Sequence, residues 1–127
     1  MQRGKISYHN RARQQRDYSG LRYDNITPTD IDGIIDYHNQ AWIILELKYL
    51  DAELPYGQRL AFERLTDDLA QVKPAIFIIA SHDIENTSVD IPAAECSVFS
   101  YRKDFAWHIP QNPVTVKELI EQEMIAQ

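Results

Sequence analysis

DIDGIIDYHNQAWIILELK, residues 30–48, is the stretch that decides the fold. Two runs rich in Ile, Leu, Trp and Tyr flank a short polar break at residues 38–40. Runs of strand-forming residues around a polar turn of this length predict a β-hairpin, with strands over 30–37 and 41–48. If the turn has three residues, Tyr37 pairs with Ala41.

This register gives the hairpin one nearly pure apolar face. That face holds Ile31, Gly33, Ile35, Tyr37, Ala41, Ile43, Leu45 and Leu47. The same register places Asp32 opposite Glu46, and Asp30 opposite Lys48. A two-residue turn would move Asp32 to the face opposite Glu46, because a one-residue slip inverts every side chain of a strand. Burial of the apolar face and assembly of the Asp32–Glu46 pair therefore favour the same register.

The rest of the chain predicts an α/β fold, a mixed β-sheet of about four to five strands flanked by helices. The predicted elements are a helix over 56–72, a central strand over 75–80, a second hairpin over 94–101 and 105–109, and a last helix over 116–126. Pro55 suits the first turn of the first helix. Thr115 and Glu118 form a possible capping box at the start of the last one.

Length and composition indicate a single globular domain over residues 1–127. The chain is 44% hydrophobic and 25% charged, and its longest apolar runs are far too short to cross a membrane. Its start has no apolar stretch typical of a secretory signal. The lone cysteine, Cys96, cannot form an internal disulfide. We therefore expect a cytoplasmic protein with no membrane segment.

Charge is distributed unevenly along the chain. Residues 1–22 carry six basic side chains and one acidic one, giving +5, whereas the other 105 residues carry seven basic and eighteen acidic ones, giving −11. A basic arm on an acidic body is typical of proteins that contact nucleic acid, since phosphate neutralisation supplies most non-specific affinity. We expect Arg11, Arg13 and Arg16 to contact DNA; the alternative is a solvated N-terminus.

Asp32, Glu46 and Lys48 are the candidate catalytic residues. Phosphodiester hydrolysis needs a divalent cation to neutralise developing charge, and Mg²⁺ usually takes one or two carboxylates. Glu46 and Lys48 alternate with Leu47, so both point to one face of a strand. A lysine at this place can orient a water molecule or help to remove its proton. Asp30 is the alternative to Asp32 as a ligand, and the alternative ion-pair partner of Lys48.

Gln58 and Arg59 open the predicted helix 56–72. Gln58 extends the apolar stripe of that helix, so it needs a polar partner, for which the strand carrying Glu46 and Lys48 is the best candidate. The alternative is a first helical turn that emerges into water. Arg59 is a candidate phosphate contact, with solvated surface as the alternative. The four histidines lack the spacing of a zinc site.

Three short strings carry a family resemblance: TDIDG at 29–33, ILELK at 44–48 and GQRL at 57–60. Together they resemble motifs II and III and the helical glutamine of the PD-(D/E)xK nuclease superfamily. The resemblance implies a restriction-endonuclease-like core over roughly residues 30–101. It implies that Asp32, Glu46 and the Leu47 carbonyl bind Mg²⁺ or Mn²⁺, that Lys48 activates water, and that Gln58 is an auxiliary residue.

Two functions follow as hypotheses. The first is a metal-dependent nuclease acting on DNA, for which the compact size and basic arm would suit a phage or other mobile element. Dimerisation is common in this family, and a domain this small would need it to cut two strands at once. The second is a nuclease-fold protein that binds a partner as an inhibitor or assembly component, with little or no catalysis. The acidic body and the lack of any glutamate before Glu46 favour the second hypothesis.

Overall fold

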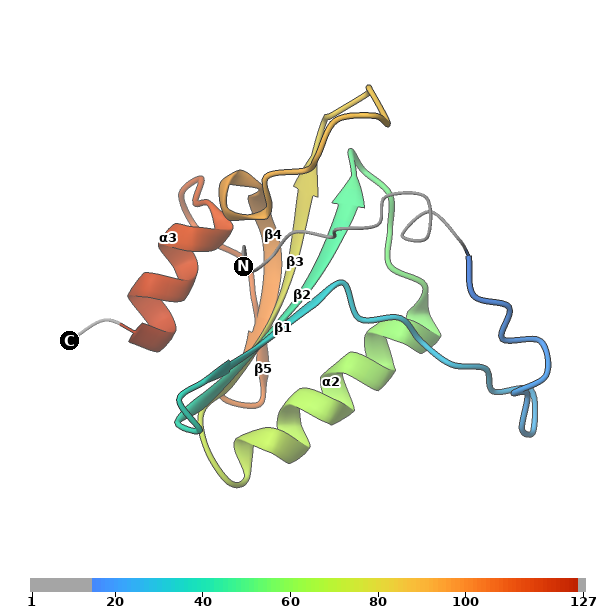
Figure 1. Cartoon of the computed structure of the whole chain (residues 1–127). Helices are drawn as coiled ribbons and strands as arrows, with labels where there is room; N and C mark the ends of the chain where they lie inside the picture. Colours follow the sequence, from blue (N-terminus) through green and yellow to red (C-terminus); the bar gives the residue numbers. More distant parts are fainter. Residues whose placement is uncertain (1–14, 126–127) are drawn as a thin grey trace.

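The computed structural model describes residues 15–125 and shows a five-stranded mixed sheet with helices on both faces (Figure 1). The strands are β1 (Gly33–Tyr37), β2 (Ala41–Tyr49), β3 (Ala75–His82), β4 (Ser97–Lys103) and β5 (Ala106–His108). The helices are α2 (Tyr56–Ala70), the 3-10 turn Ala93–Glu95, and α3 (Val116–Ile120), which continues as a π-helical turn over Glu121–Ile125. The predicted fold class is thus confirmed at this level.

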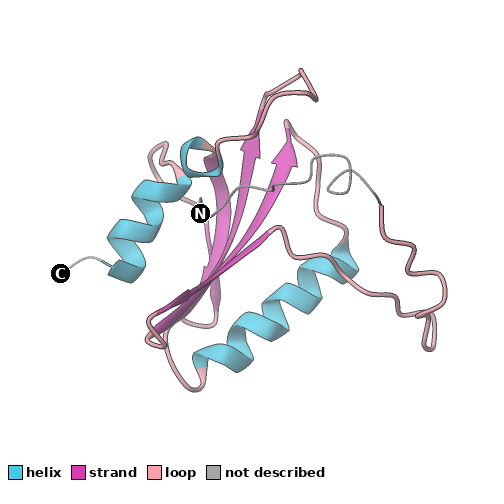
Figure 2. Cartoon of the chain, in the orientation of Figure 1, coloured by secondary structure: helices cyan, strands magenta, loops and turns pink. Residues whose placement is uncertain are grey.

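The strands lie in the sheet in their order along the chain. Neighbouring strands are antiparallel except β2 and β3, which run parallel and are connected by α2. Parallel strands need such a crossover because a tight turn cannot join them. Figure 2 shows that residues 15–32, the described part of the chain before β1, form neither a helix nor a strand. Within residues 15–125, no helix combines the length and the apolarity needed to cross a membrane.

The first hairpin has the predicted register. Tyr37 pairs with Ala41 and Gly33 with Leu45, around the turn 38–40. His38 and Asn39 have positive φ angles of 53° and 58°. The strand prediction was wrong at its start, because β1 begins at Gly33 rather than at residue 30.

The hydrogen-bond ladder between β1 and β2 ends where the Asp32 side chain replaces a backbone acceptor. The Leu47 amide donates a hydrogen bond of 2.7 Å to Asp32 Oδ2, where the next backbone acceptor of a longer β1 would otherwise lie. Asp32 therefore caps the hairpin and releases the preceding residues from the sheet.

The sheet buries apolar side chains on both faces. One core cluster lies between the sheet and α3, and its buried residues are Ile43, Ile76, Ile78, Ala80, Cys96, Val116 and Leu119. The other lies between the sheet and α2, and its buried residues are Ile44, Phe62, Phe77 and Ile79. All of residues 75–80 are buried, as expected of a central strand covered on both sides. Because side chains alternate along β2, Glu46 and Lys48 share the α2 face with Ile44.

The second hairpin turns later than predicted. β4 continues through Lys103, and the turn lies at Asp104 and Phe105, which both have positive φ angles. Arg102 and Lys103 are therefore strand residues, and acidic side chains hold them. Arg102 forms two hydrogen bonds to Asp67, of 3.0 and 2.7 Å.

The other differences concern element ends. β3 extends to His82, two residues beyond the predicted strand, and the last helix changes from α to π geometry after Ile120. The predicted capping box is confirmed: Thr115 Oγ1 accepts from the Glu118 amide at 3.1 Å, and Glu118 Oε1 accepts from the Thr115 amide at 2.9 Å.

Candidate active site

Glu46 and Lys48 lie together on the α2 face of β2, and Asp32, in the residues just before β1, lies near Glu46. Lys48 Nζ lies 3.0 Å from Glu46 Oε2. The nearby Asp32 carboxylate raises the pKa of Glu46. The pairing of Gly33 with Leu45 brings Asp32 beside the end of the ladder, where it contacts the Leu47 amide and lies near Glu46.

Glu46 is a buried carboxylate that lacks one partner. The residue is only 6% exposed, and its Oε1 atom has no hydrogen-bond partner within residues 15–125. Burial raises the pKa of Glu46 from its ordinary value of 4.5 to about 6; the Lys48 ammonium lowers this pKa, and Asp32 raises it. An unpartnered buried carboxylate oxygen is unfavourable, so a cation, a proton or a water molecule would stabilise this atom.

Asp32 is exposed, and its bond to the Leu47 amide fixes its direction. The same residue, Leu47, carries the carbonyl that the resemblance implies as a third ligand. Asp30 lies elsewhere, because it accepts a 3.1 Å hydrogen bond from the Tyr18 hydroxyl. The alternative ion pair between Asp30 and Lys48 is wrong, since Lys48 pairs with Glu46 instead.

The metal ligands that the resemblance implies are two carboxylates and one backbone carbonyl, not three side chains. In the part of the chain that the structure describes, no three His, Cys, Asp or Glu side chains are grouped so that they could hold a metal ion. A hard cation such as Mg²⁺ binds through one or two carboxylates and completes its shell with carbonyl, water and phosphate oxygens.

A cavity of about 400 Å³ opens beside Lys48. Its walls come from the carboxyl-terminal part of β2, from the loop 50–54, from the first turns of α2 at Arg59, and from β3 and β4 at Ser81 and Phe99. Lys48 is thus shared between the carboxylate cluster and the cavity. Any molecule in this cavity lies next to the candidate catalytic lysine.

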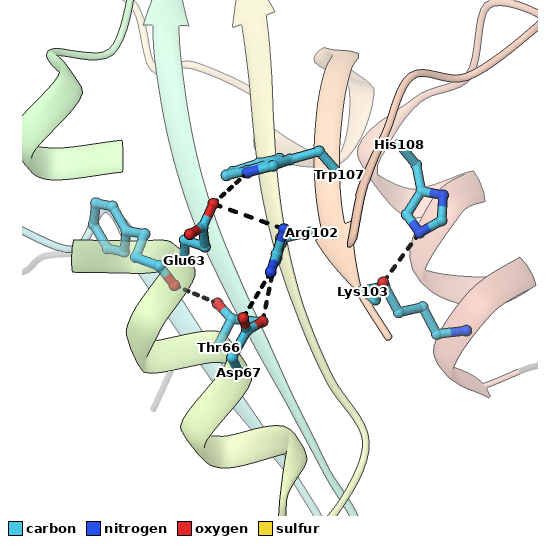
Figure 3. Close-up of polar contacts among 8 residues, drawn as sticks. Glu63, Thr66, Asp67, Arg102, Lys103, Trp107 and His108 are labelled. Atoms are coloured by element: carbon cyan, nitrogen blue, oxygen red, sulfur yellow. Dashed lines mark hydrogen bonds and ion pairs between the residues drawn. The ribbon is translucent and has the colours of Figure 1, made fainter. Parts of the chain in front are cut away.

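Arg59 is held at the cavity wall by an aromatic ring. Its guanidinium carbon lies 4.4 Å from the centre of the Trp107 ring, a cation–π contact. Figure 3 shows how Trp107 is fixed in turn, by a 2.7 Å hydrogen bond from its Nε1 to Glu63 Oε1. Among the described residues, no carboxylate forms an ion pair with Arg59.

Sequence reasoning missed Trp107 and Phe99, and one signal could have helped. Arg59, Glu63 and Asp67 recur every four residues, so they form a polar stripe on α2. Such a stripe indicates that the helix meets polar partners along one side. It does not say which strand supplies them, so Trp107 and Arg102 could not be identified in advance.

The remaining predicted site residues differ in how far the structure places them. Gln58 is half-buried in the first turn of α2, and within residues 15–125 no hydrogen bond joins it to Glu46 or Lys48. Arg11 and Arg13 lie outside the described residues. The chain was compared with protein-family models, with curated proteins and with solved structures, and none of these comparisons found a match.

Proposed function

We propose that the protein is a Mg²⁺- or Mn²⁺-dependent nuclease that hydrolyses phosphodiester bonds in DNA. The observation that carries this proposal is Glu46: a buried carboxylate beside a second carboxylate and a lysine, with one oxygen left without a partner. The β2–α2–β3 crossover after the hairpin supports a restriction-endonuclease-like core, since it is the element order that the resemblance implies.

The donor set fits a hard divalent cation. Burial and the neighbouring Asp32 disfavour the charged form of Glu46, and Glu46 Oε1 has no hydrogen-bond partner among the described residues. These two carboxylates and the Leu47 carbonyl would hold the ion, together with water and substrate oxygens. When bound, the ion supplies charge neutralisation at the phosphate and lowers the pKa of water.

Lys48 supplies the remaining chemistry from this chain. Its side chain is 22% exposed, so it can reach a substrate while its ammonium stays 3.0 Å from Glu46. From this position the ammonium donates hydrogen bonds to the attacking water and to a phosphate oxygen. Donors fixed in advance where negative charge develops stabilise the transition state without reorganising.

A second candidate function is binding without catalysis. The contacts of Asp32 with the Leu47 amide and of Lys48 with Glu46 favour it, because each group already has a partner that would serve a purely structural role. In that case the domain acts as an inhibitor or assembly partner.

The deciding experiment combines metal-dependent stability with cleavage. We expect Mg²⁺ or Mn²⁺ to raise the thermal midpoint of the wild type, by the equivalent of about 2.7 kcal/mol at a hundredfold excess over Kd. The Glu46→Ala variant should lose this shift. Glu46→Ala and Lys48→Ala should both abolish metal-dependent cleavage of a panel of linear, branched and single-stranded DNA.

Matched controls separate the site from general charge effects. Asp36 lies on the same face of the same hairpin, and Lys117 is an exposed lysine on α3. Asp36→Ala and Lys117→Ala should keep both the metal shift and the cleavage. A folded wild type that shows neither shift nor cleavage would overturn the nuclease and leave the binding module.

A further inference from the structure

Phe99 lines the cavity beside Lys48, and it lies at a shift in register between β3 and β4. Ile79 pairs with Ser100, but the next residue of β3, Ala80, pairs with Val98. Phe99 is therefore a bulge residue without a partner in β3. Such bulges re-aim side chains and are common next to active sites.

Phe99 is unusually exposed to solvent for a phenylalanine. Its side chain is 66% exposed, and it forms part of the cavity wall. Nothing in the hydrophobic core depends on this ring, since it belongs to neither core cluster. An aromatic face presented at a cavity is a surface on which a planar ring can stack.

The other walls suit a planar ring with polar edges better than a bare anion. Two cations, Lys48 and Arg59, are balanced there by two carboxylates, Asp51 and Glu53. Leucine and alanine side chains of the loop 50–54 add apolar surface, and serine hydroxyls of β3 and β4 add donors and acceptors. Small-molecule sites combine apolar walls with a few placed polar groups in this way.

We infer that this cavity receives an unpaired nucleobase of the substrate, stacked on Phe99, next to the phosphate that Lys48 faces. The inference rests on the proposed nuclease function and names its substrate class. A base within a duplex is paired and stacked, so it cannot enter a pocket without being extruded, at a cost of a few kcal/mol. The enzyme therefore prefers single-stranded DNA, or branched DNA with unpaired nucleotides, over a continuous duplex.

Arg59 has a defined part in this arrangement. The Trp107 ring holds its guanidinium at the cavity wall, and Glu63 orients that ring. A guanidinium fixed by a ring rather than by a carboxylate keeps its hydrogen-bond donors for another acceptor. We assign Arg59 to the phosphate that joins the bound nucleotide to the next one.

The test compares strands that differ only in one base. A single abasic site is moved along a labelled single strand, and kcat/KM is measured for the wild type and for Phe99→Ala. We expect Phe99→Ala to lower kcat/KM on the intact strand about tenfold, the order of magnitude measured for losing one stacked base. At one position relative to the cut, the abasic site should lower the kcat/KM of the wild type by the same factor as Phe99→Ala does. At that position it should not change the kcat/KM of Phe99→Ala.

Two further variants keep this test sharp. Phe99→Tyr retains a stacking ring and should restore the wild-type value. Phe105→Ala removes another exposed phenylalanine, 49% exposed in the β4–β5 turn and outside the cavity, and should change nothing. Equal wild-type rates on single strand and duplex, or no sensitivity to the abasic position, would overturn the inference while leaving the nuclease intact.

A binding readout separates failure of the inference from failure of the nuclease. The fluorescent base 2-aminopurine is placed in the single strand at each position in turn, and its emission is followed on binding. If the wild type buries one base and Phe99→Ala does not, the result supports base binding in the cavity, even if no metal-dependent cleavage occurs. Cleavage without any such Phe99-dependent signal contradicts it.

Discussion

Glu46 shows how one residue links the sequence, the stability and the proposed chemistry of the site. Alternation along β2 sends it to the α2 face, where burial and Asp32 both disfavour its charge. Lys48 compensates only in part, since the pKa of Glu46 still rises to about 6. Keeping a buried carboxylate charged is unfavourable, and carboxylates in such surroundings are common where a cation or substrate binds.

The raised pKa predicts how stability depends on pH without metal. The folded protein binds more protons than the unfolded chain between pH 4.5 and about 6, so the free energy of unfolding falls as pH rises through that window. The loss is about 2 kcal/mol for a shift of this size. Glu46→Gln mimics the protonated form, so its stability relative to the wild type should increase by about that amount over the same window.

Urea unfolding in chelator at a series of pH values measures this difference. Asp36→Asn, which changes an exposed acid on the same hairpin face, should follow the wild-type pH dependence. Parallel curves for Glu46→Gln and the wild type would show that Glu46 keeps its ordinary pKa, and would remove the electrostatic basis of the site.

Part of the site could be predicted at the level of single residues. The two-residue period of a strand and the three-residue turn are local, so the register that pairs Tyr37 with Ala41 and Gly33 with Leu45 could be predicted. The burial of Glu46 could not be predicted, because it depends on what covers the sheet. The contacts of Arg102 with Asp67 and of Trp107 with Glu63 join residues 35 and 44 positions apart, which no local pattern can pair.

Among the elements, the strands and helices were predictable where periodicity is strong, and less so at their ends. Residues 75–80 are apolar throughout and form the buried part of β3. The second turn was misplaced because Arg, Lys and Asp suggested a polar turn, whereas the backbone turns at Asp104 and Phe105. A phenylalanine at positive φ is uncommon, so composition does not reveal it.

The helix cap gives a prediction at this scale. Thr115 closes the capping box of α3, whose residues Val116 and Leu119 are buried against the sheet. Thr115→Ala leaves a helix amide without its acceptor, so we expect a loss of about 1 kcal/mol in the free energy of unfolding. Thr115→Ser keeps the oxygen and should stay close to the wild type in chemical denaturation. Equal losses in both variants would mean that the threonine methyl, not the cap, matters.

For the molecule as a whole, charge is separated along the chain. The acidic body repels a phosphate backbone, so non-specific affinity for DNA has to come from a region of opposite sign. Residues 1–22 carry that sign, at +5 against −11 for the rest. In the proposed nuclease, capture of DNA therefore belongs to the N-terminal arm, and positioning of the reacting phosphate to Lys48 and Arg59.

The arm makes a prediction that does not depend on cleavage. Changing Arg11, Arg13 and Arg16 to alanine should weaken DNA binding and flatten its salt dependence. With fewer phosphate contacts, fewer counterions are released from the DNA on binding. The slope of log affinity against log salt should fall by roughly one unit per lost contact.

Fluorescence anisotropy across a salt series, in chelator to prevent cleavage, measures this slope. Removing the same amount of charge from the body, with Arg64, Lys73 and Lys117 changed to alanine, should leave the slope nearly unchanged, since those residues belong to the part of the chain with net charge −11. If the two triple variants lose slope equally, DNA binding follows net charge rather than its distribution. The arm would then have no separate role in holding DNA at the site of Glu46 and Lys48.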